Sequence, residues 1–194
     1  MNAPRSFSDR VQYPEDKDLV QRCLTGDERA WSALIDKYKN LIFSIPVKLG
    51  FDPEHAADVF QSVCLSLLRE LPQLREPRAL PAWLIRMTAR KCFRWEQEQR
   101  RYTGMDSNWD APDETHTLPE TLMQELEREQ IVREAVNGLS GECRRLIELL
   151  FFSSPPIPYE EAARRLSLAT GSIGATRMRC LDKLRRTLER RHLR

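Results

Sequence analysis

The chain of 194 residues lacks the signals of membrane insertion and secretion. No apolar run approaches the roughly 20 residues that a membrane-spanning helix needs. The N-terminal stretch MNAPRSFSDRVQYPED has no apolar core of the kind that a signal peptide carries. We therefore expect a cytoplasmic protein that inserts into no membrane.

Glycine and histidine are scarce, and the motifs of common enzymes are absent from the sequence. The seven glycines form no phosphate-binding loop, and no nucleophile elbow or paired-histidine motif occurs. The three histidines, His55, His116 and His192, lie far apart and show no metal-ligand spacing. We expect no catalytic residue, no cofactor, no metal site and no small-molecule substrate.

The cysteines are few and form no C-x-x-C pair. Each lies in a stretch with helical periodicity, and this placement favours reduced, mostly buried thiols over a disulfide or zinc framework. The five are Cys23, Cys64, Cys92, Cys143 and Cys180.

No segment alternates apolar and polar residues as a strand does, whereas helical periodicity extends over most of the chain. Asp27 and Asp52 are predicted helix N-caps, the second followed by Pro53 at the first helical position. The fold class predicted is all-α, with two small helical domains joined by an acidic linker. The segments expected are a flexible tail at 1–14, a helical bundle at 15–101, the linker at 102–119 and a helix-turn-helix domain at 120–194.

The net charge of +2 conceals a strong charge pattern. Residues 71–101 hold eight basic and three acidic side chains, a balance of +5; residues 102–142 hold two and ten, a balance of −8. Residues 143–194 hold twelve and five, a balance of +7. Two basic segments on either side of an acidic one indicate two separate contacts with a polyanion. Ordinary solvated helix faces are the alternative.

The helix predicted from Pro53 has a polar face interrupted by one leucine. A single exposed leucine is normal in a soluble protein, but carboxylate and amide groups one turn away could make it the anchor of a protein partner. The residues of this face are Asp58, Gln61, Ser62, Leu65 and Arg69.

The helix predicted from Ala82 has an apolar side, to which we assign Trp95, and a side where aromatic residues interleave with arginines. Cations that bind phosphates and rings that stack on bases are typical of single-strand binding surfaces. The alternative is that both rings pack against the preceding connector. The residues of this side are Trp83, Arg86, Arg90, Phe93, Arg94 and Gln97.

The C-terminal stretch predicts a helix-turn-helix. A short amphipathic helix from Tyr159 is followed by the connector SLAT and by a helix that opens with small and hydroxylated residues. Small residues let backbone amides approach phosphate, and the basic residues after them are suited to binding in a DNA groove. A helical hairpin with a basic surface is the alternative. The predicted contacts are Thr170, Gly171, Ser172, Gly174, Ala175, Thr176, Arg177, Arg179 and Lys183.

Taken in order, these segments resemble the extracytoplasmic-function sigma factors, the small two-domain members of the main bacterial sigma family. GDERAWSALIDKYKNLIFSIPVKLG, HAADVFQSVCLSLLREL and PAWLIRMTARKCFRW resemble the first promoter-binding domain of that family. The stretch from LSGECRRLIELLFF to the last helix resembles the second. The likeness covers about 160 residues, and the ordered set of segments carries it rather than any one motif.

The resemblance implies a non-enzymatic initiation factor and its partners. The face with Asp58 and Gln61 would bind the clamp helices of the largest subunit of RNA polymerase core, and the C-terminal domain would bind the polymerase flap. The face from Trp83 to Gln97 would hold the non-template strand of the downstream promoter element. The last helix would read the upstream element as duplex, and the acidic linker would follow the RNA exit path. An anti-sigma factor is the expected inhibitor.

The chain departs from the family pattern at several positions. Ser62 replaces a common acidic residue, and Arg90 and Arg94 replace a frequent asparagine and aspartate. Ser167 stands where the turn usually has glycine, while Gly174 and Ala175 replace a common Lys-Ser pair. These departures leave the promoter sequence open. A stand-alone dimeric helix-turn-helix regulator is the second hypothesis; it would bind a two-fold operator without polymerase.

Overall fold

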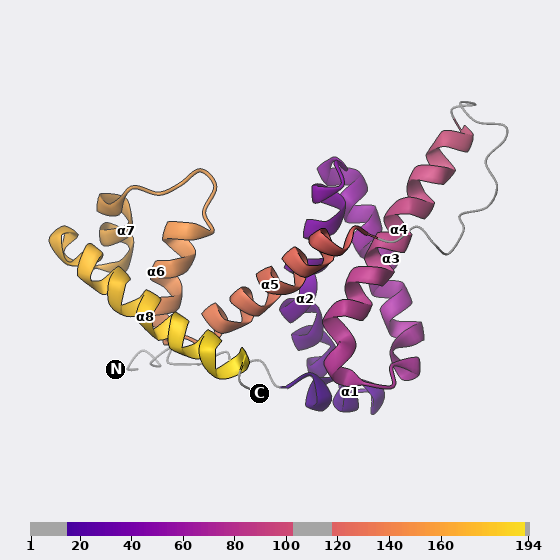
Figure 1. The fold of residues 1–194 in the computed structure, drawn as a ribbon, viewed down its shortest axis with the longest axis horizontal. Coiled ribbons are helices and arrows are strands. Elements are labelled where there is room, and N and C mark those ends of the chain that lie inside the picture. The colour runs from indigo at the N-terminus through magenta and orange to yellow at the C-terminus, as the bar shows by residue number, and fades with distance from the viewer. Residues whose placement is uncertain (1–14, 103–117, 193–194) are drawn as a thin grey trace, which may run out of the picture. The chain divides into compact units, whose positions relative to one another are not determined.

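The computed structural model describes residues 15–102 and 118–192, which are helical with no strand (Figure 1). Their contacts divide them into two compact units, one ending at Gln130 and the other beginning at Ile131. We call them the N-terminal unit and the C-terminal unit. Within these ranges no helix is both long and apolar enough to cross a membrane. The all-α prediction is confirmed.

The N-terminal unit is a bundle of helices whose starts the sequence predicts well. The predicted caps are confirmed: Asp27 accepts hydrogen bonds from the backbone amides of Arg29 (2.9 Å) and Ala30 (3.2 Å), and Asp52 accepts one from that of His55 (2.9 Å). A capping carboxylate satisfies amides that the first helical turn leaves unpaired. The elements are α1 (Asp16–Leu24), α2 (Glu28–Lys48), α3 (Pro53–Glu70), the short 3-10 helices η1 (Leu71–Gln73) and η2 (Pro77–Ala79), and α4 (Leu80–Tyr102).

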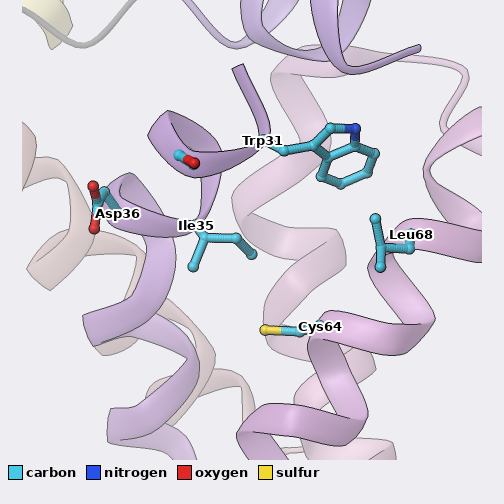
Figure 2. A pocket seen from close by; sticks show the side chains of 6 residues that line it. Trp31, Ile35, Asp36, Cys64 and Leu68 are labelled. Carbon is cyan, nitrogen blue, oxygen red and sulfur yellow. The ribbon is translucent and has the colours of Figure 1, made fainter. Parts of the chain in front are cut away.

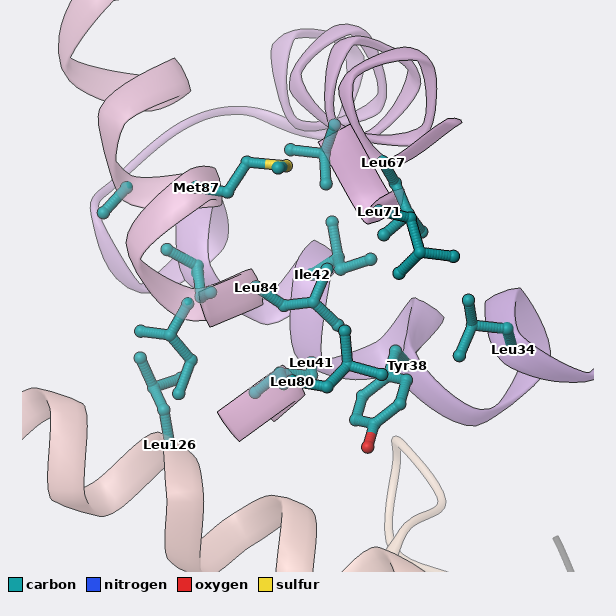
Figure 3. Close-up of a cluster of buried hydrophobic side chains, with 14 of the residues drawn as sticks. Leu34, Tyr38, Leu41, Ile42, Leu67, Leu71, Leu80, Leu84, Met87 and Leu126 are labelled. Atoms are coloured by element: carbon teal, nitrogen blue, oxygen red, sulfur yellow. The ribbon is translucent and has the colours of Figure 1, made fainter. Parts of the chain in front are cut away.

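The core of the N-terminal unit lies around α2, which packs against α1, α3 and α4. Leucine and isoleucine side chains from all of these helices meet there with almost no exposure (Figure 3). The ring of Tyr38 is buried among them, and its hydroxyl donates to Asp16 Oδ1 at 2.7 Å. Lys37 Nζ lies 2.7 Å from the same oxygen, so one carboxylate links α1 to two residues of α2.

The helix α5 (Glu120–Asn137) contributes to the cores of both units, and the division falls inside it. Leu122 and Leu126 pack on the N-terminal core, and Lys48 Nζ lies 2.8 Å from Glu125 Oε1. Ala135 and Val136 belong to the C-terminal core. The sequence places a boundary after residue 119 because the composition changes there. The structure divides the chain later, because one continuous helix supplies apolar residues to both cores.

The C-terminal unit contains a helix-turn-helix arrangement. Its core is small: ten buried residues, of which two are alanines and two are cysteines. The elements after α5 are α6 (Gly141–Phe151), α7 (Tyr159–Leu166), the 3-10 helix η3 (Thr170–Ser172) and α8 (Ile173–His192). The connector from Ser167 to Ala169 between α7 and η3 is tight, as the motif requires.

Ser167 explains why glycine is usual in this turn. It caps α7 in the left-handed conformation, with φ of 54°, and its amide bonds back to the carbonyl of Arg164. A side chain at positive φ costs roughly 1–2 kcal/mol, partly offset by the greater chain entropy that glycine loses on folding. We therefore expect Ser167→Gly to stabilise the C-terminal unit by about 0.5–1 kcal/mol. Urea unfolding of the whole chain measures it, and an unchanged or lower midpoint would contradict the strain.

The prediction that all cysteines are reduced thiols is wrong for one pair. Cys143 of α6 and Cys180 of α8 form a disulfide, with their Cα atoms 5.2 Å apart. These residues are 37 positions apart in sequence, and only the packing of α6 on α8 brings them together. Cys23, Cys64 and Cys92 are free thiols, as predicted.

The Arg22–Asp27 pair makes the N-terminal unit sensitive to acid. Arg22 Nε and Nη2 donate to Asp27 Oδ2 at 3.0 and 2.9 Å, and this contact is the main reason that the pKa of Asp27 lies below its ordinary value. A lowered folded-state pKa contributes stability that is complete above the unfolded pKa, about 3.9, and is lost as the pH falls through the folded value. We expect Asp27→Asn to flatten the decline of unfolding free energy below about pH 4. Chemical unfolding between about pH 2 and 7, a range that brackets the ordinary pKa, measures the effect. Parallel profiles of unfolding free energy against pH for wild type and Asp27→Asn would contradict it.

Candidate nucleic-acid and partner-binding surfaces

The first candidate surface is one side of α3, which we call the α3 ridge: Asp58, Gln61, Ser62, Leu65 and Arg69. Four of the five side chains are exposed, and Ser62 is half-buried. Leu65 is 61% exposed, so the structure keeps a large apolar side chain in water between a carboxylate and a guanidinium. The opposite side of α3 is anchored by Val59, Val63 and Leu67 in the core. The ridge therefore faces outward from a fixed helix.

The second candidate surface lies on α4 and divides into charged and aromatic parts. Arg86, Arg90 and Arg94 are exposed and recur at every fourth residue, so they form one stripe along the helix, which we call the arginine stripe. Trp83 and Phe93 are half-buried and pack against the core. The arginines are therefore placed as a phosphate-binding surface requires, while the two rings also contribute to packing against the core. Gln97 is half-buried.

Trp95 differs from the prediction that it faces the core. It is half-buried outside the main cluster, where its ring centroid lies 4.3 Å from that of His55 and 5.1 Å from that of Phe51. Asp52 Oδ2 lies 2.7 Å from His55 Nδ1, so the cap of α3 also orients the ring beside Trp95. The α4 periodicity missed this position because Trp95 packs on Phe51 of the loop before α3 and on His55 in the first turn of α3.

A hollow of about 270 Å³ connects the two candidate surfaces. Asp58 and Ser62 line it from the α3 ridge, and Arg94 and Trp95 line it from α4. Arg94 Nε also lies 3.9 Å from Glu98 Oε1 along its own helix. The sequence treats the ridge and the stripe as separate surfaces, whereas the packing of α3 on α4 makes them neighbours.

The third candidate surface is formed by η3 and α8. Ala175, Arg179 and Lys183 are exposed at every fourth residue and form a second basic stripe, which we call the α8 stripe. Thr170 and Gly171 are exposed ahead of it. No atom of the described chain lies within 4 Å of a Cβ built at Gly171 or Gly174, so internal packing does not require glycine at either position. The open space is available to an external group.

Other predicted residues at this surface support their neighbours. Thr176 is only 7% exposed, and its hydroxyl accepts a hydrogen bond from Arg179 Nη2 at 3.1 Å. Thr176 therefore orients Arg179 instead of facing solvent itself. The hydroxyl of Ser172 donates to the carbonyl of Ala169 at 2.7 Å and closes the turn. The guanidinium of Arg177 lies over the ring of Tyr159, 5.9 Å from its centroid.

The sequence prediction missed an apolar groove between α2 and α3, of about 480 Å³. Trp31 and Ile35 of α2 face Cys64 and Leu68 of α3 across it, with Asp36 at the rim (Figure 2). Leu68 is 54% exposed. The available signal was the apolar residue at position 68, one turn after the exposed Leu65.

Comparisons with known proteins show which proteins this chain is similar to. The model of sigma-70 region 2 matches residues 34–102, the segment that contains both the α3 ridge and the arginine stripe. The RNA polymerase sigma-H factor of Pseudomonas aeruginosa is 26% identical over 185 residues, which is 90% of this chain and 94% of that protein. The chain is therefore similar to sigma-70 proteins through its region 2 segment and through relatives that are named as sigma factors.

Other relatives of this chain are named as members of the extracytoplasmic-function class, the class that the sequence resemblance indicated. The sigma-E factor of Escherichia coli K12 is 26% identical over 167 residues, covering 81% of this chain and 86% of that protein. Two solved structures have 19% identity: CnrH with the cytosolic domain of CnrY (TM-score 0.39, 91% of this chain and 98% of that one) and RpoE with the anti-sigma factor NepR from Bartonella quintana (TM-score 0.33, 80% and 96%).

The named relatives indicate the class of function. Sigma factors are non-enzymatic subunits that bind RNA polymerase and direct initiation at promoters. The named relatives favour this function over a stand-alone helix-turn-helix regulator. The predicted acidic linker lies, apart from its ends, outside the described residues.

Proposed function

We propose that this sigma factor uses three surfaces in sequence during initiation. The α3 ridge holds the clamp helices of the polymerase, the arginine stripe holds the non-template strand of the downstream element, and the α8 stripe reads the upstream element as duplex. The proposal places this work in the bacterial cytoplasm. The observation that carries it is the exposed arginine stripe within the region 2 match.

The α3 ridge suits a protein partner because it combines one apolar anchor with charged and amide groups. Burial of Leu65 would supply apolar contact area, and Asp58 and Arg69 would set the orientation through opposite charges. The half-buried Ser62 contributes little charge to this surface. Across the hollow, α4 contributes the charged side chains of Lys91, Arg94 and Glu98.

The arginine stripe suits a single strand because its three guanidinium groups follow the helix axis at one-turn intervals. Side chains four residues apart in a helix are neighbours about 6 Å apart, which matches the spacing of successive phosphates in an extended strand. Half-buried Trp83 and Phe93 hold their rings in fixed positions beside the stripe. Rigid rings lose little entropy on stacking with a base, so strand separation gains binding energy from both contacts.

The α8 stripe suits a duplex because its N-terminal end combines open space with oriented donors. The first turns of α8 present backbone amides and the positive end of the helix dipole, which attract a phosphate. Arg179, oriented by Thr176, is one turn further along and can reach a base edge. The C-terminal unit is proposed to bind the polymerase flap as well, and the resemblance adds an anti-sigma factor as the inhibitor.

Run-off transcription tests the whole proposal. Purified core polymerase, this chain and fragments of genomic DNA should produce discrete transcripts that are absent when the chain is omitted. A footprint on a palindrome by the chain alone, with no transcript in the presence of core polymerase, would overturn the proposal.

Arg179→Ala tests the duplex contact. We expect affinity for the upstream element to fall by about 1–3 kcal/mol if the guanidinium contacts a base. Arg179 is exposed and outside the core, so the unfolding midpoint should not change. Fluorescence anisotropy of the polymerase-bound factor on duplex DNA measures the effect, and Arg185→Ala, from a different side of α8, is the matched control. Equal affinities for wild type and Arg179→Ala would place recognition elsewhere.

A further inference from the structure

The disulfide between Cys143 and Cys180 has no part in the proposed promoter contacts. Cys143 lies in the first turn of α6, and Cys180 lies in the second turn of α8, next to Arg179 in sequence. Both residues are buried, at 5% and 1% exposure. The bond therefore ties the helix that carries the α8 stripe to the helix that supports it from behind.

The C-terminal unit depends on this bond more than a larger domain would. Its ten-residue core includes Ala135 and Ala163, and the remaining aliphatic side chains are few. A unit of this size buries a small fraction of its apolar surface, so a single cross-link is a large part of its stability. The loop that the bond closes spans 37 residues and includes all of α7 and η3. Closing a loop of that length removes much entropy from the unfolded chain.

Cys23 and Cys92 are as buried as the bonded pair, and the three free thiols differ from that pair in forming no disulfide. Burial raises the pKa of Cys23 to about 11 and that of Cys92 to about 12, and it also raises the pKa of Cys64. A thiol is nucleophilic only as the thiolate, so these three exchange slowly with disulfides at neutral pH. All three lie in the N-terminal unit. Thiol–disulfide chemistry of the folded chain is thus expected at Cys143 and Cys180, the two cysteines that lie close enough to bond.

We propose that the Cys143–Cys180 pair is a thiol–disulfide switch: the bonded form holds α8 in the arrangement that reads duplex, and the reduced form loosens the C-terminal unit. The oxidant is a low-molecular-weight disulfide, for which oxidised glutathione serves as the probe. One cysteine thiolate attacks a glutathione sulfur, the glutathione S–S bond breaks, and one glutathione thiolate leaves and takes up the released proton. The second cysteine thiolate then displaces the other glutathione, so two thiols are oxidised and one glutathione disulfide is reduced to two thiols.

Counting thiols tests the chemical step on the full chain. After equilibration in oxidised glutathione, denatured protein should show three free thiols, against five after reduction, with an intact mass lower by two hydrogens. Cys64→Ser should lose one thiol in both conditions and keep the difference of two. Five thiols in both conditions, or glutathione adducts in place of the mass loss, would overturn the proposal.

Unfolding and DNA binding test the consequence. We expect reduction to lower the midpoint of the C-terminal thermal transition by about 10 °C or more while the N-terminal transition stays in place. Cys143→Ala/Cys180→Ala should behave like the reduced chain and ignore glutathione, while reduced wild type provides the same comparison without any substitution. Equal midpoints for the bonded and reduced wild-type chains would overturn the proposal.

The DNA-binding part of this test rests on the proposed function. Failure of the switch and failure of the proposed function give different results. At a temperature between the midpoints of the reduced and the bonded C-terminal unit, reduction should weaken duplex binding by the polymerase-bound factor at least tenfold. If the midpoint moves and duplex binding is detectable but insensitive to reduction, the switch is overturned. If the bonded factor binds no duplex at all while the midpoint moves, the proposed reading of the upstream element is what fails, and the redox control of the C-terminal unit stands.

Discussion

Asp58→Arg is expected to abolish association with core RNA polymerase. The substitution replaces an anionic group of the α3 ridge with a cation, across the hollow from Arg94 and two turns from Leu65. A like charge placed in an interface built for the opposite one costs several kcal/mol, and about 3 kcal/mol corresponds to a hundredfold weaker complex. Co-purification with core polymerase and a titration of the fluorescent factor both measure the loss.

The matched control for this prediction is Glu28→Arg, which makes the same change of charge on an exposed residue of α2. It should retain association with polymerase. Both variants should fold into intact helical units, because neither residue lies in a core. If Asp58→Arg co-purifies like the control, polymerase docking does not use the α3 ridge, and the groove of Trp31 and Leu68 becomes the next surface to test.

Replacing the whole arginine stripe with glutamines is the second large effect. Arg86→Gln, Arg90→Gln and Arg94→Gln together should weaken binding of the polymerase-bound factor to the non-template strand about a hundredfold at 0.1 M salt. The slope of log affinity against log salt should fall in magnitude by about 2, because each phosphate contact on a single strand contributes about 0.7. Binding to single-stranded oligonucleotides over a range of salt concentrations measures both.

The slope makes this prediction specific to phosphate contacts. Lys17→Gln removes an exposed cation from α1 and should leave the slope unchanged. The three arginines are exposed, so the triple variant should keep the unfolding midpoint of the N-terminal unit. A variant that loses affinity with an unaltered salt slope would mean that the stripe acts by some contact other than with phosphate.

Local features of the chain could be read from the sequence because short-range physics determines them. Asp27 and Asp52 cap helices through amides only two or three residues away, and the four-residue spacing of the arginine stripe follows from the helix itself. Ser167 was recognised as the turn position where the family usually has glycine, and its φ is positive in the structure. The family could be recognised for a related reason: the order of such local signals survives where individual residues differ.

Features that join distant positions required the tertiary structure. The Cys143–Cys180 bond exists because α6 packs on α8, and no local pattern indicates that packing. Trp95 lies beside Phe51 and His55 because the start of α3 and the loop before it pack on α4. The shared role of α5 has the same origin, since a helix with apolar residues on several sides can serve two cores.

The sequence by itself therefore determined the helices, their caps and the charged stripes, because each depends on residues within a few turns of one another, and the order of these segments carried the resemblance to sigma factors. Only the tertiary structure decided that the α3 ridge adjoins the arginine stripe, which thiols pair and where the two units divide. Those properties depend on side chains that helix packing brings together from far along the chain.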